Sequence, residues 1–306
     1  MVLFLARRVG QAALILLGVA AITFVLLYCL PADPAVLIAG RSANPQIVAA
    51  IRHELGLDQP LILQFLHYLY GLLHGDFGRS YTEKTEVLPL ILARLPATLI
   101  LMAAGIFVEV VLGLTFGVVA AVLRDGPIDR VIMMLSFVGV SSPQFVVALL
   151  LLYVFAATLG WFPMSGFGTP ANVVLPAVTL GVLGAGWYAR MVRSAMIEVL
   201  RQDYVRTAHA KGLRVSRVVM RHALPNAILP IIAMIGIDIG QFMGGVVVVE
   251  AVYGWPGIGQ LAWQAIQQVD VPIIMGVTLV SALAIVIGNL AADFIAPFVD
   301  PRIRAQ

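Results

Sequence analysis

Residues 96–123, PATLILMAAGIFVEVVLGLTFGVVAAVL, form an apolar run that contains a single charged side chain, Glu109. A helix needs about 20 apolar residues to cross the roughly 30 Å hydrocarbon core of a bilayer. Five further stretches reach that length, at about 9–30, 131–159, 173–197, 226–249 and 272–297. The sequence therefore predicts an all-α, polytopic membrane protein with six transmembrane helices.

The composition of the 306-residue chain agrees with a membrane protein. Hydrophobic residues make up 61% of it, charged residues only 11%, and the mean hydropathy is +0.99. Soluble domains carry about 25% charged residues, so this chain has too little polar surface to cover a core in water. The net charge of +3 does not indicate nucleic-acid binding, because most basic residues lie in short segments beside apolar runs. Cys29 is the only cysteine, so no disulfide framework and no cysteine zinc site is expected.

The N-terminal segment, residues 1–30, is expected to retain its apolar helix. Arg7 and Arg8 precede the helix as they would in a secretory signal. The apolar run is longer, however, than a signal core of about 7–15 residues, and no A-x-A cleavage motif follows it. We therefore expect a short cytoplasmic N-terminus followed by the first transmembrane helix.

The positions of lysine and arginine predict the orientation of the helices, because cytoplasmic loops of membrane proteins are enriched in these residues. Basic side chains gather in the N-terminus, in the segments 124–130 and 190–221, and in the tail 298–306. All of these lie on one side of a six-helix arrangement. The loops 160–172 and 250–271, on the other side, contain no lysine or arginine. Both termini are therefore expected to face the cytoplasm.

Residues 31–95 are predicted to form a helical insertion on the extracytoplasmic side. Asn44 is a suitable N-cap, with Pro45 at the first helical position. Gly56 should end that helix, and Pro60 should open a second, amphipathic one. The insertion is expected to pack on the mouth of the helix bundle or to lie in the membrane interface.

The rest of the chain, residues 96–297, is predicted to form a core of five transmembrane helices. This core includes a cytoplasmic segment, 198–225, and an outer loop, 250–271, and a cytoplasmic tail, 298–306, follows it. Pro143 lies within the predicted third span, where the missing backbone N–H should kink or interrupt the helix.

No residue pattern indicates an enzyme or a metal site, since the sequence lacks zinc-protease and nucleophile-elbow motifs and its histidines are scattered. A phosphate-binding P-loop needs Gly-Lys followed by Ser or Thr. The only two lysines, Lys84 and Lys211, follow Glu83 and Ala210, so neither completes this motif. No cofactor is therefore expected in this chain, and any ATP that drives it must be bound by another polypeptide.

Three carboxylates lie at predicted membrane depth, namely Glu109, Asp238 and Asp293, and Gln241 follows Asp238 by one helical turn. A charge at the centre of a spanning helix costs about 2.5–3.5 kcal/mol or more, so it usually faces the protein interior or water. These side chains are candidates to line a translocation path, and the alternative is a structural pairing. They also keep open a second hypothesis, an autonomous secondary transporter or channel.

The segment 203–225, DYVRTAHAKGLRVSRVVMRHALP, departs from the apolar character of its surroundings. Asp203 is a possible cap for a helix over 204–211, which Gly212 should stop. A second helix over 214–223 then leads to Leu224 and Pro225. A short helix held out in the cytoplasm is suited to dock into a cleft of another protein. The alternative is a basic loop that only sets the topology.

At these residues the chain resembles the importer permeases of ATP-binding-cassette (ABC) systems. Their cytoplasmic signature is Glu-Ala-Ala, then Gly three residues further on, then Ile-x-Leu-Pro. Four residues of this chain match the spacing: Ala208, Gly212, Leu224 and Pro225. Three depart from it, with Arg206 in place of Glu, Thr207 in place of the first Ala and His222 in place of Ile. The departures are similar to the form DYVRTARAKG of the dipeptide, oligopeptide and nickel branch. Other segments agree with that branch: LPADPA at 30–35, LGLDQPL at 55–61, GDFGRS at 75–80, VYGWPGIG at 252–259 and DPRIR at 300–304.

The resemblance implies a type I ABC importer permease fold and a pore subunit of the bacterial inner membrane. It implies as partners a second, similar permease, two cytoplasmic ATPase subunits that hold ATP and magnesium, and an extracytoplasmic solute-binding protein. Transport would follow alternating access, with peptides as the preferred substrates and glutathione or nickel chelates as alternatives. The residues expected to couple to the ATPases are Asp203, Tyr204, Arg206, Thr207, Ala208, Ala210, Lys211, Gly212, Leu224 and Pro225. Those expected to meet the binding protein are Trp255, Pro256 and Trp263.

Overall fold

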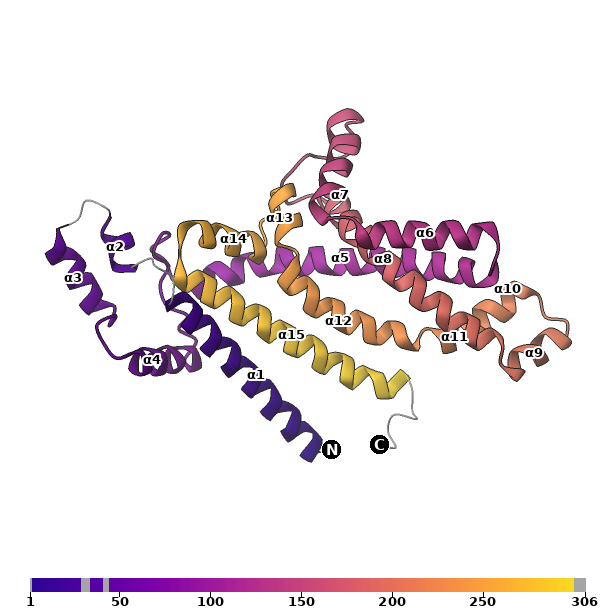
Figure 1. The fold of residues 1–306 in the computed structure, drawn as a ribbon, viewed down its shortest axis with the longest axis horizontal. Helices are drawn as coiled ribbons and strands as arrows, with labels where there is room; N and C mark the ends of the chain where they lie inside the picture. Colours follow the sequence, from indigo (N-terminus) through magenta and orange to yellow (C-terminus); the bar gives the residue numbers. More distant parts are fainter. Residues whose placement is uncertain (1, 29–33, 41–43, 300–306) are drawn as a thin grey trace. The chain divides into compact units, whose positions relative to one another are not determined.

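The structure, a computed structural model, describes residues 2–28, 34–40 and 44–299. The described residues form helices, with one isolated β-bridge between Arg79 and Glu86. The elements (Figure 1) are α1 (Val2–Tyr28), α2 (Pro34–Ala39), α3 (Pro45–Glu54), α4 (Leu61–Leu73), α5 (Val87–Val122), α6 (Pro127–Ser141), α7 (Gln144–Leu151), the π-helix η1 (Leu152–Thr158), α8 (Pro170–Leu200), α9 (Asp203–Ala210), α10 (Val215–Val218), the π-helix η2 (Val219–Ala223), α11 (Leu224–Ala227), α12 (Leu229–Gly245), α13 (Val247–Tyr253), α14 (Ile258–Gln268) and α15 (Val271–Val299).

Four helices of the described chain, α1, α5, α8 and α15, are long and apolar enough to cross a membrane. Two bent pairs pass the same test, α6 with α7 and η1, and α10–α11 with α12. Counting each bent pair as one span gives the predicted six. The second span begins at Val87, earlier than the predicted residue 96, and Pro96, where the predicted span began, lies inside α5. The predicted boundary between the insertion and the core therefore falls inside α5.

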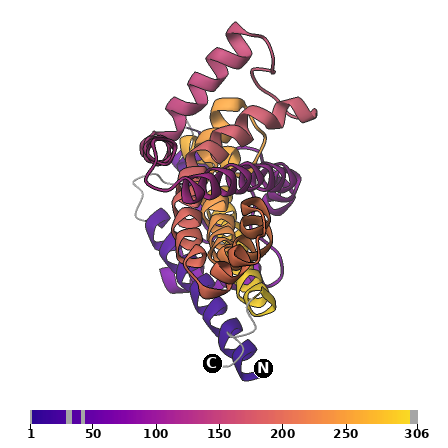
Figure 2. The same cartoon turned by 90° about the vertical axis from the view of Figure 1, so that its right-hand side faces the viewer.

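The third span is interrupted where the sequence predicted it. α6 ends at Ser141, and α7 begins at Gln144 with Pro143 as its N-cap. The two parts are bent by 106°, and the ribbon shows α7 and η1 turning away from α6 (Figures 1 and 2). Pro143 has no N–H to continue the hydrogen-bond ladder of α6, which explains the break.

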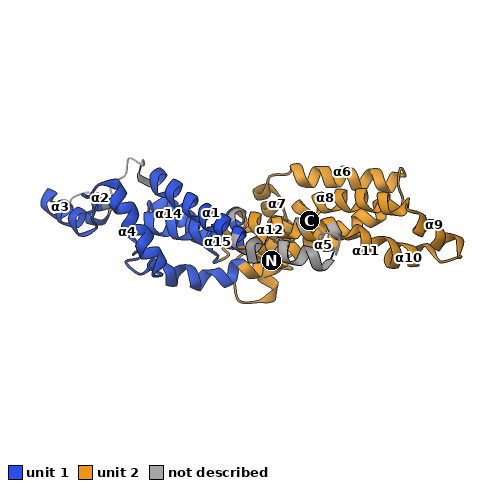
Figure 3. Ribbon diagram, turned by 90° about the horizontal axis from the view of Figure 1, so that it is seen from below, with its two compact units in different colours: residues 1–98, 243–247, 256–286 blue, residues 99–242, 248–255, 287–306 orange. Residues whose placement is uncertain are grey.

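One compact unit comprises residues 1–98, 243–247 and 256–286 (Figure 3). Its insertion confirms the predicted caps, since the Asn44 side chain accepts a hydrogen bond from Gln46 N at 3.1 Å and α3 begins at Pro45. Gly56 follows α3 with φ +66°, a left-handed conformation that favours glycine. Pro60 is the N-cap of α4, as predicted.

Within the same unit, Asp270 fastens the loop before α5 to the start of α15. Its carboxylate is fully buried, and Oδ2 accepts hydrogen bonds from Ser80 Oγ at 2.6 Å, Thr82 Oγ1 at 2.7 Å and Thr82 N at 3.0 Å. A buried carboxylate with three donors is stabilised, whereas the same donors without it would be left unsatisfied.

Replacing Asp270 with alanine is expected to lower the free energy of unfolding by about 2 kcal/mol, because it leaves the buried Ser80 hydroxyl without its charged acceptor. Asp270→Asn, which keeps one acceptor oxygen, should cost less. Thermal unfolding of the purified protein in detergent measures both. Equal unfolding temperatures for wild type and Asp270→Ala would show that the three hydrogen bonds do not hold this loop.

The second compact unit comprises residues 99–242, 248–255 and 287–306, of which 300–306 lie outside the described residues. Its part of α5 packs closely on α8 at two glycines. A Cβ on Gly113 would overlap the Tyr188 side chain, and one on Gly117 would lie 2.7 Å from Ala189 O. On the other side of α8, Gly186 lies against the backbone of Ser136 in α6. α8 is thus a central helix of this unit.

Candidate coupling helix and transmembrane cavity

α9 forms over Asp203–Ala210, close to the predicted 204–211. The N-cap is Gln202, not Asp203, because Gln202 has extended backbone angles and Asp203 is already helical. The Asp203 carboxylate instead lies in the first turn, where the helix dipole favours a negative charge, with Oδ1 3.4 Å from Arg206 Nη1. Gly212 ends the turn with φ +74°, as its position in the sequence predicted.

The two faces of α9 have different surroundings. Val205 and Ala208 are buried and pack with Val218, bordered by Leu200 and Leu213. Ala208, 6% exposed, was expected to contact an ATPase, but its side chain faces the interior of this chain, because residues three apart share one face of a helix. The other predicted coupling residues of the segment are exposed: Asp203, Tyr204, Arg206, Thr207, Ala210, Lys211 and Gly212. Five of these residues lie in α9 and two directly follow it, and we call the seven together the free face of α9.

The Leu-Pro pair predicted to belong with α9 opens the short helix α11. Leu224 is half-buried and packs on the core around Tyr188, whereas Pro225, in the first turn, is exposed. Asn226, which no sequence motif indicated, donates from Nδ2 to the Tyr204 hydroxyl at 3.0 Å. This hydrogen bond joins α9 to α11, so the two predicted parts of the signature are in direct contact.

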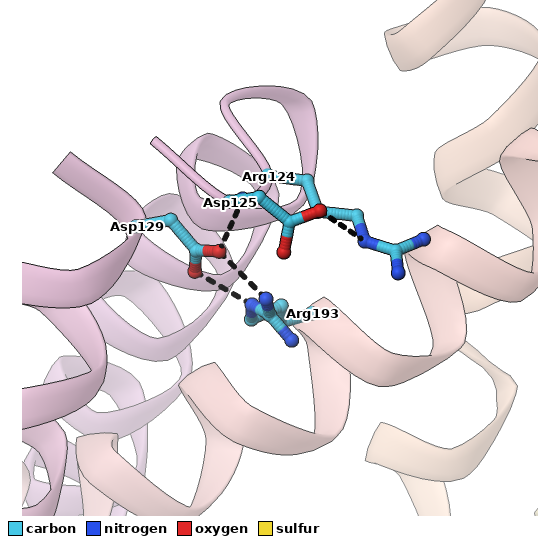
Figure 4. Close-up of polar contacts among 4 residues, drawn as sticks. All are labelled: Arg124, Asp125, Asp129 and Arg193. Atoms are coloured by element: carbon cyan, nitrogen blue, oxygen red, sulfur yellow. Dashed lines mark hydrogen bonds and ion pairs between the residues drawn. The ribbon is translucent and has the colours of Figure 1, made fainter. Parts of the chain in front are cut away.

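An ion pair fixes the end of α8 that leads into α9. Arg193 donates from Nε to Asp129 Oδ1 and from Nη2 to Asp129 Oδ2, both at 2.6 Å (Figure 4). Asp125 N donates to Asp129 Oδ2 at 2.9 Å, and Arg124 Nε lies 3.3 Å from the Asp125 carboxylate. The Asp129 side chain is 4% exposed. A bidentate ion pair of this kind, with its carboxylate buried, sets the geometry of α6 and α8 relative to each other.

A cavity of about 320 Å³ lies between α5, α8 and α12 of the same unit. Three of the four predicted path residues line it: Glu109, Asp238 and Gln241. The fourth, Asp293, belongs to α15, and its side chain lies outside the described residues. The lining contains two carboxylates and no lysine, arginine or histidine among the described residues.

The two carboxylates of this cavity have different partners. Asp238 accepts a hydrogen bond at Oδ2 from the Tyr188 hydroxyl. Glu109 is 3% exposed, and its Oε2 has no hydrogen-bond partner in the described chain. Its carboxylate lies over Gly184, where a Cβ would occupy the same space. The sequence did not predict that Tyr188 and Gly184 belong to this cavity. The two residues lie one turn apart on α8.

The residues expected to meet a binding protein differ in exposure. Trp255 is fully buried and packs edge-on against Phe167, with ring centroids 4.8 Å apart, so its indole is not available to a partner. The preceding Gly254, with φ +58°, turns the chain so that the indole points inward. Pro256 is half-buried, and Trp263 is exposed. Trp263 alone of the three offers a large exposed side chain.

Comparison with known proteins assigns this architecture. Residues 113–305 match the family described as binding-protein-dependent transport system inner membrane component, and residues 1–102 match the N-terminal family of the same membrane component. The chain belongs to this permease family. It is a transporter permease component, and several apolar helices make it a multi-pass protein of the inner membrane.

Curated relatives cover nearly the whole permease. A Brucella abortus protein named as a peptide transport system permease is 40% identical over an alignment of 306 positions, which covers 97% of this chain and 98% of the relative. The glutathione transport system permease protein GsiC of Salmonella typhi is 40% identical over 289 residues, 94% of each chain. The MetNI methionine ABC transporter, in an inward-facing conformation, gives a TM-score of 0.60 at 20% identity over 70% of this chain and 97% of that chain. The fold is that of type I ABC importer permeases, and the chain is a permease component of a binding-protein-dependent transport system.

Proposed function

We propose that this permease moves peptides or glutathione-like peptides inward, driven by two separate ATPase subunits that bind ATP and magnesium. A second, similar permease completes the pore, and an extracytoplasmic binding protein delivers the solute to it. The names of the curated relatives support peptide and glutathione substrates. In this arrangement both termini and the tail 298–306 face the cytoplasm, residues 31–95 lie outside it, and the chain itself catalyses no reaction. An autonomous secondary transporter is not favoured, because the family depends on a binding protein.

The free face of α9 is the observation that carries the coupling role. Its residues are exposed, and the opposite face is held by Val205 and Ala208. Tyr204, itself on the free face, connects α9 to α11 through its hydrogen bond with Asn226. A short helix fixed on one side and open on the other can enter a groove of an ATPase without losing its position. Movement of the ATPases would then act on α9 as a rigid lever.

α8 provides a physical connection from this lever to the cavity. It leads into α9 at its C-terminal end, is held by Arg193 about two turns earlier, and contributes Gly184 and Tyr188 to the cavity wall. A rotation or shift of α8 that follows α9 would therefore change the surroundings of Glu109 and Asp238. In this way ATP binding is expected to change the side of the membrane to which the cavity opens.

A matched pair of cysteines tests the coupling. In a Cys29→Ser background, Ala210→Cys places a thiol on the free face, whereas Ala208→Cys places one on the buried face two residues away. In the complete importer, a cysteine-reactive crosslinker of short span should join position 210 to an ATPase subunit. The yield should change at least threefold on addition of ATP, and position 208 should stay unlinked. No crosslink from position 210, or equal yields from both positions, would refute the docking of α9.

A further inference from the structure

The cavity of the permease unit is lined by two carboxyl groups and, among the described residues, by no basic side chain. Glu109 and Asp238 both line it, so the two groups cannot both ionise without repelling each other. Tyr188 satisfies one oxygen of Asp238, but Oε2 of Glu109 is buried without a hydrogen-bond partner. A buried carboxylate without a partner is strongly disfavoured, so the site favours the entry of a group that donates hydrogen bonds or carries positive charge.

The residues that line the site favour an organic cation over a metal ion. No cluster of three or more histidine, cysteine, aspartate or glutamate side chains that could hold a metal is present in the described part of the chain. The other polar residues of the lining are Ser142, Gln144 and Gln241. Trp187 also lines the cavity, but its ring already carries the Arg190 guanidinium, 4.5 Å from the ring centroid. Two carboxyl groups and neutral hydrogen-bonding groups supply the acceptors that an ammonium group needs, since it has three donors and one positive charge.

We propose that Glu109 and Asp238 bind the primary ammonium group at the N-terminal end of the transported solute. This inference rests on the proposed function, because it takes the cavity as part of the solute path. A volume of about 320 Å³ is at the lower end for small-molecule sites, so the cavity receives one end of a peptide and leaves the rest to the remainder of the pore. Peptides and glutathione share a free α-ammonium group, so one site serves both classes.

Gly184 is part of the same site because it makes room for the Glu109 carboxylate. A side chain at position 184 would occupy the space in which that carboxylate lies. Gly184 also belongs to α8, the helix that leads into α9. The position of the ammonium-binding carboxylate is therefore tied to the helix on which the ATPases act.

The test compares two dipeptides that differ only at the N-terminus, where acetylation replaces the charged ammonium group with a neutral amide. The complete importer, in lipid nanodiscs without binding protein and without nucleotide, is titrated calorimetrically with dialanine and with N-acetyl-dialanine. Dialanine should bind at least tenfold more tightly than its acetylated analogue. Glu109→Gln and Asp238→Asn should each reduce this preference below threefold, while Glu198→Gln, which removes an exposed carboxylate of α8 outside the cavity, should retain it.

Three results would overturn the ammonium site: no binding of dialanine to the wild type, equal binding of the two dipeptides, or a preference that survives both cavity substitutions. Asp238→Asn keeps an acceptor oxygen for the Tyr188 hydroxyl, so it decides the test if Glu109→Gln fails to assemble. The titration needs no ATP and no movement of α9. A positive cysteine crosslink with a failed titration would therefore reject the ammonium site alone, and the reverse would reject the coupling role alone.

Discussion

Replacing Gly117 with leucine is expected to destabilise the helical core of the permease by about 3 kcal/mol, at the upper end of what overpacking usually costs. A Cβ at this position would lie 2.5 Å from Val192 Cβ and 2.7 Å from Ala189 O. The second of these is a backbone oxygen, which cannot rotate away, so α5 and α8 would have to separate. Thermal unfolding in detergent, followed by the loss of monodisperse protein, measures the effect.

Gly18→Leu in α1 is the matched control, since a Cβ on Gly18 meets no atom within 4 Å. It adds the same side chain to another apolar helix and should leave the unfolding temperature nearly unchanged. If Gly117→Leu were as stable as Gly18→Leu, the close approach of α5 and α8 would not be a source of stability. The position of Glu109 over Gly184 would then also need another explanation, because it depends on the same approach.

Local signals in the sequence predicted much of this fold. The apolar runs identified the spans, Pro143 identified the break in the third one, and Asn44 and Gly56 identified the ends of α3. Each of these features acts within a few residues along the chain, through hydrogen bonding or backbone conformation. Gly212 marked the end of α9 for the same reason.

The features that could not be predicted join residues distant in the sequence. Tyr188 meets Asp238 only because α8 packs near α12, and Asp129 in isolation is indistinguishable from an ordinary acidic residue at the start of a helix. The burial of Ala208 was missed because α9 is short and has one large apolar residue, Val205, which gives too weak a pattern to assign its faces. The resemblance implied a contact of Trp255 with a binding protein, whereas its indole fills a core position.

Removing the guanidinium of Arg193 is expected to weaken both the structure and the coupling. Arg193→Ala leaves the largely buried Asp129 carboxylate with Asp125 N as its remaining donor among the described contacts. The free energy of unfolding should fall by about 2 kcal/mol, since hydrogen bonds to charged groups contribute about 1.5–3 kcal/mol and the pair is partly open to solvent. Arg130→Ala, which removes an exposed arginine of α6, should have little effect.

A double substitution separates the loss of the ion pair between Arg193 and Asp129 from the cost of leaving a buried carboxylate unpaired. Asp129→Ala combined with Arg193→Ala should be more stable than Arg193→Ala alone, because no buried carboxylate remains unpaired. Solute transported per ATP hydrolysed should nevertheless stay several-fold below wild type in both variants, because α8 is no longer fixed to α6 near the end that carries α9. If the double variant regains full transport, the pair serves stability alone, and the force from α9 must reach the cavity without the connection between α6 and α8.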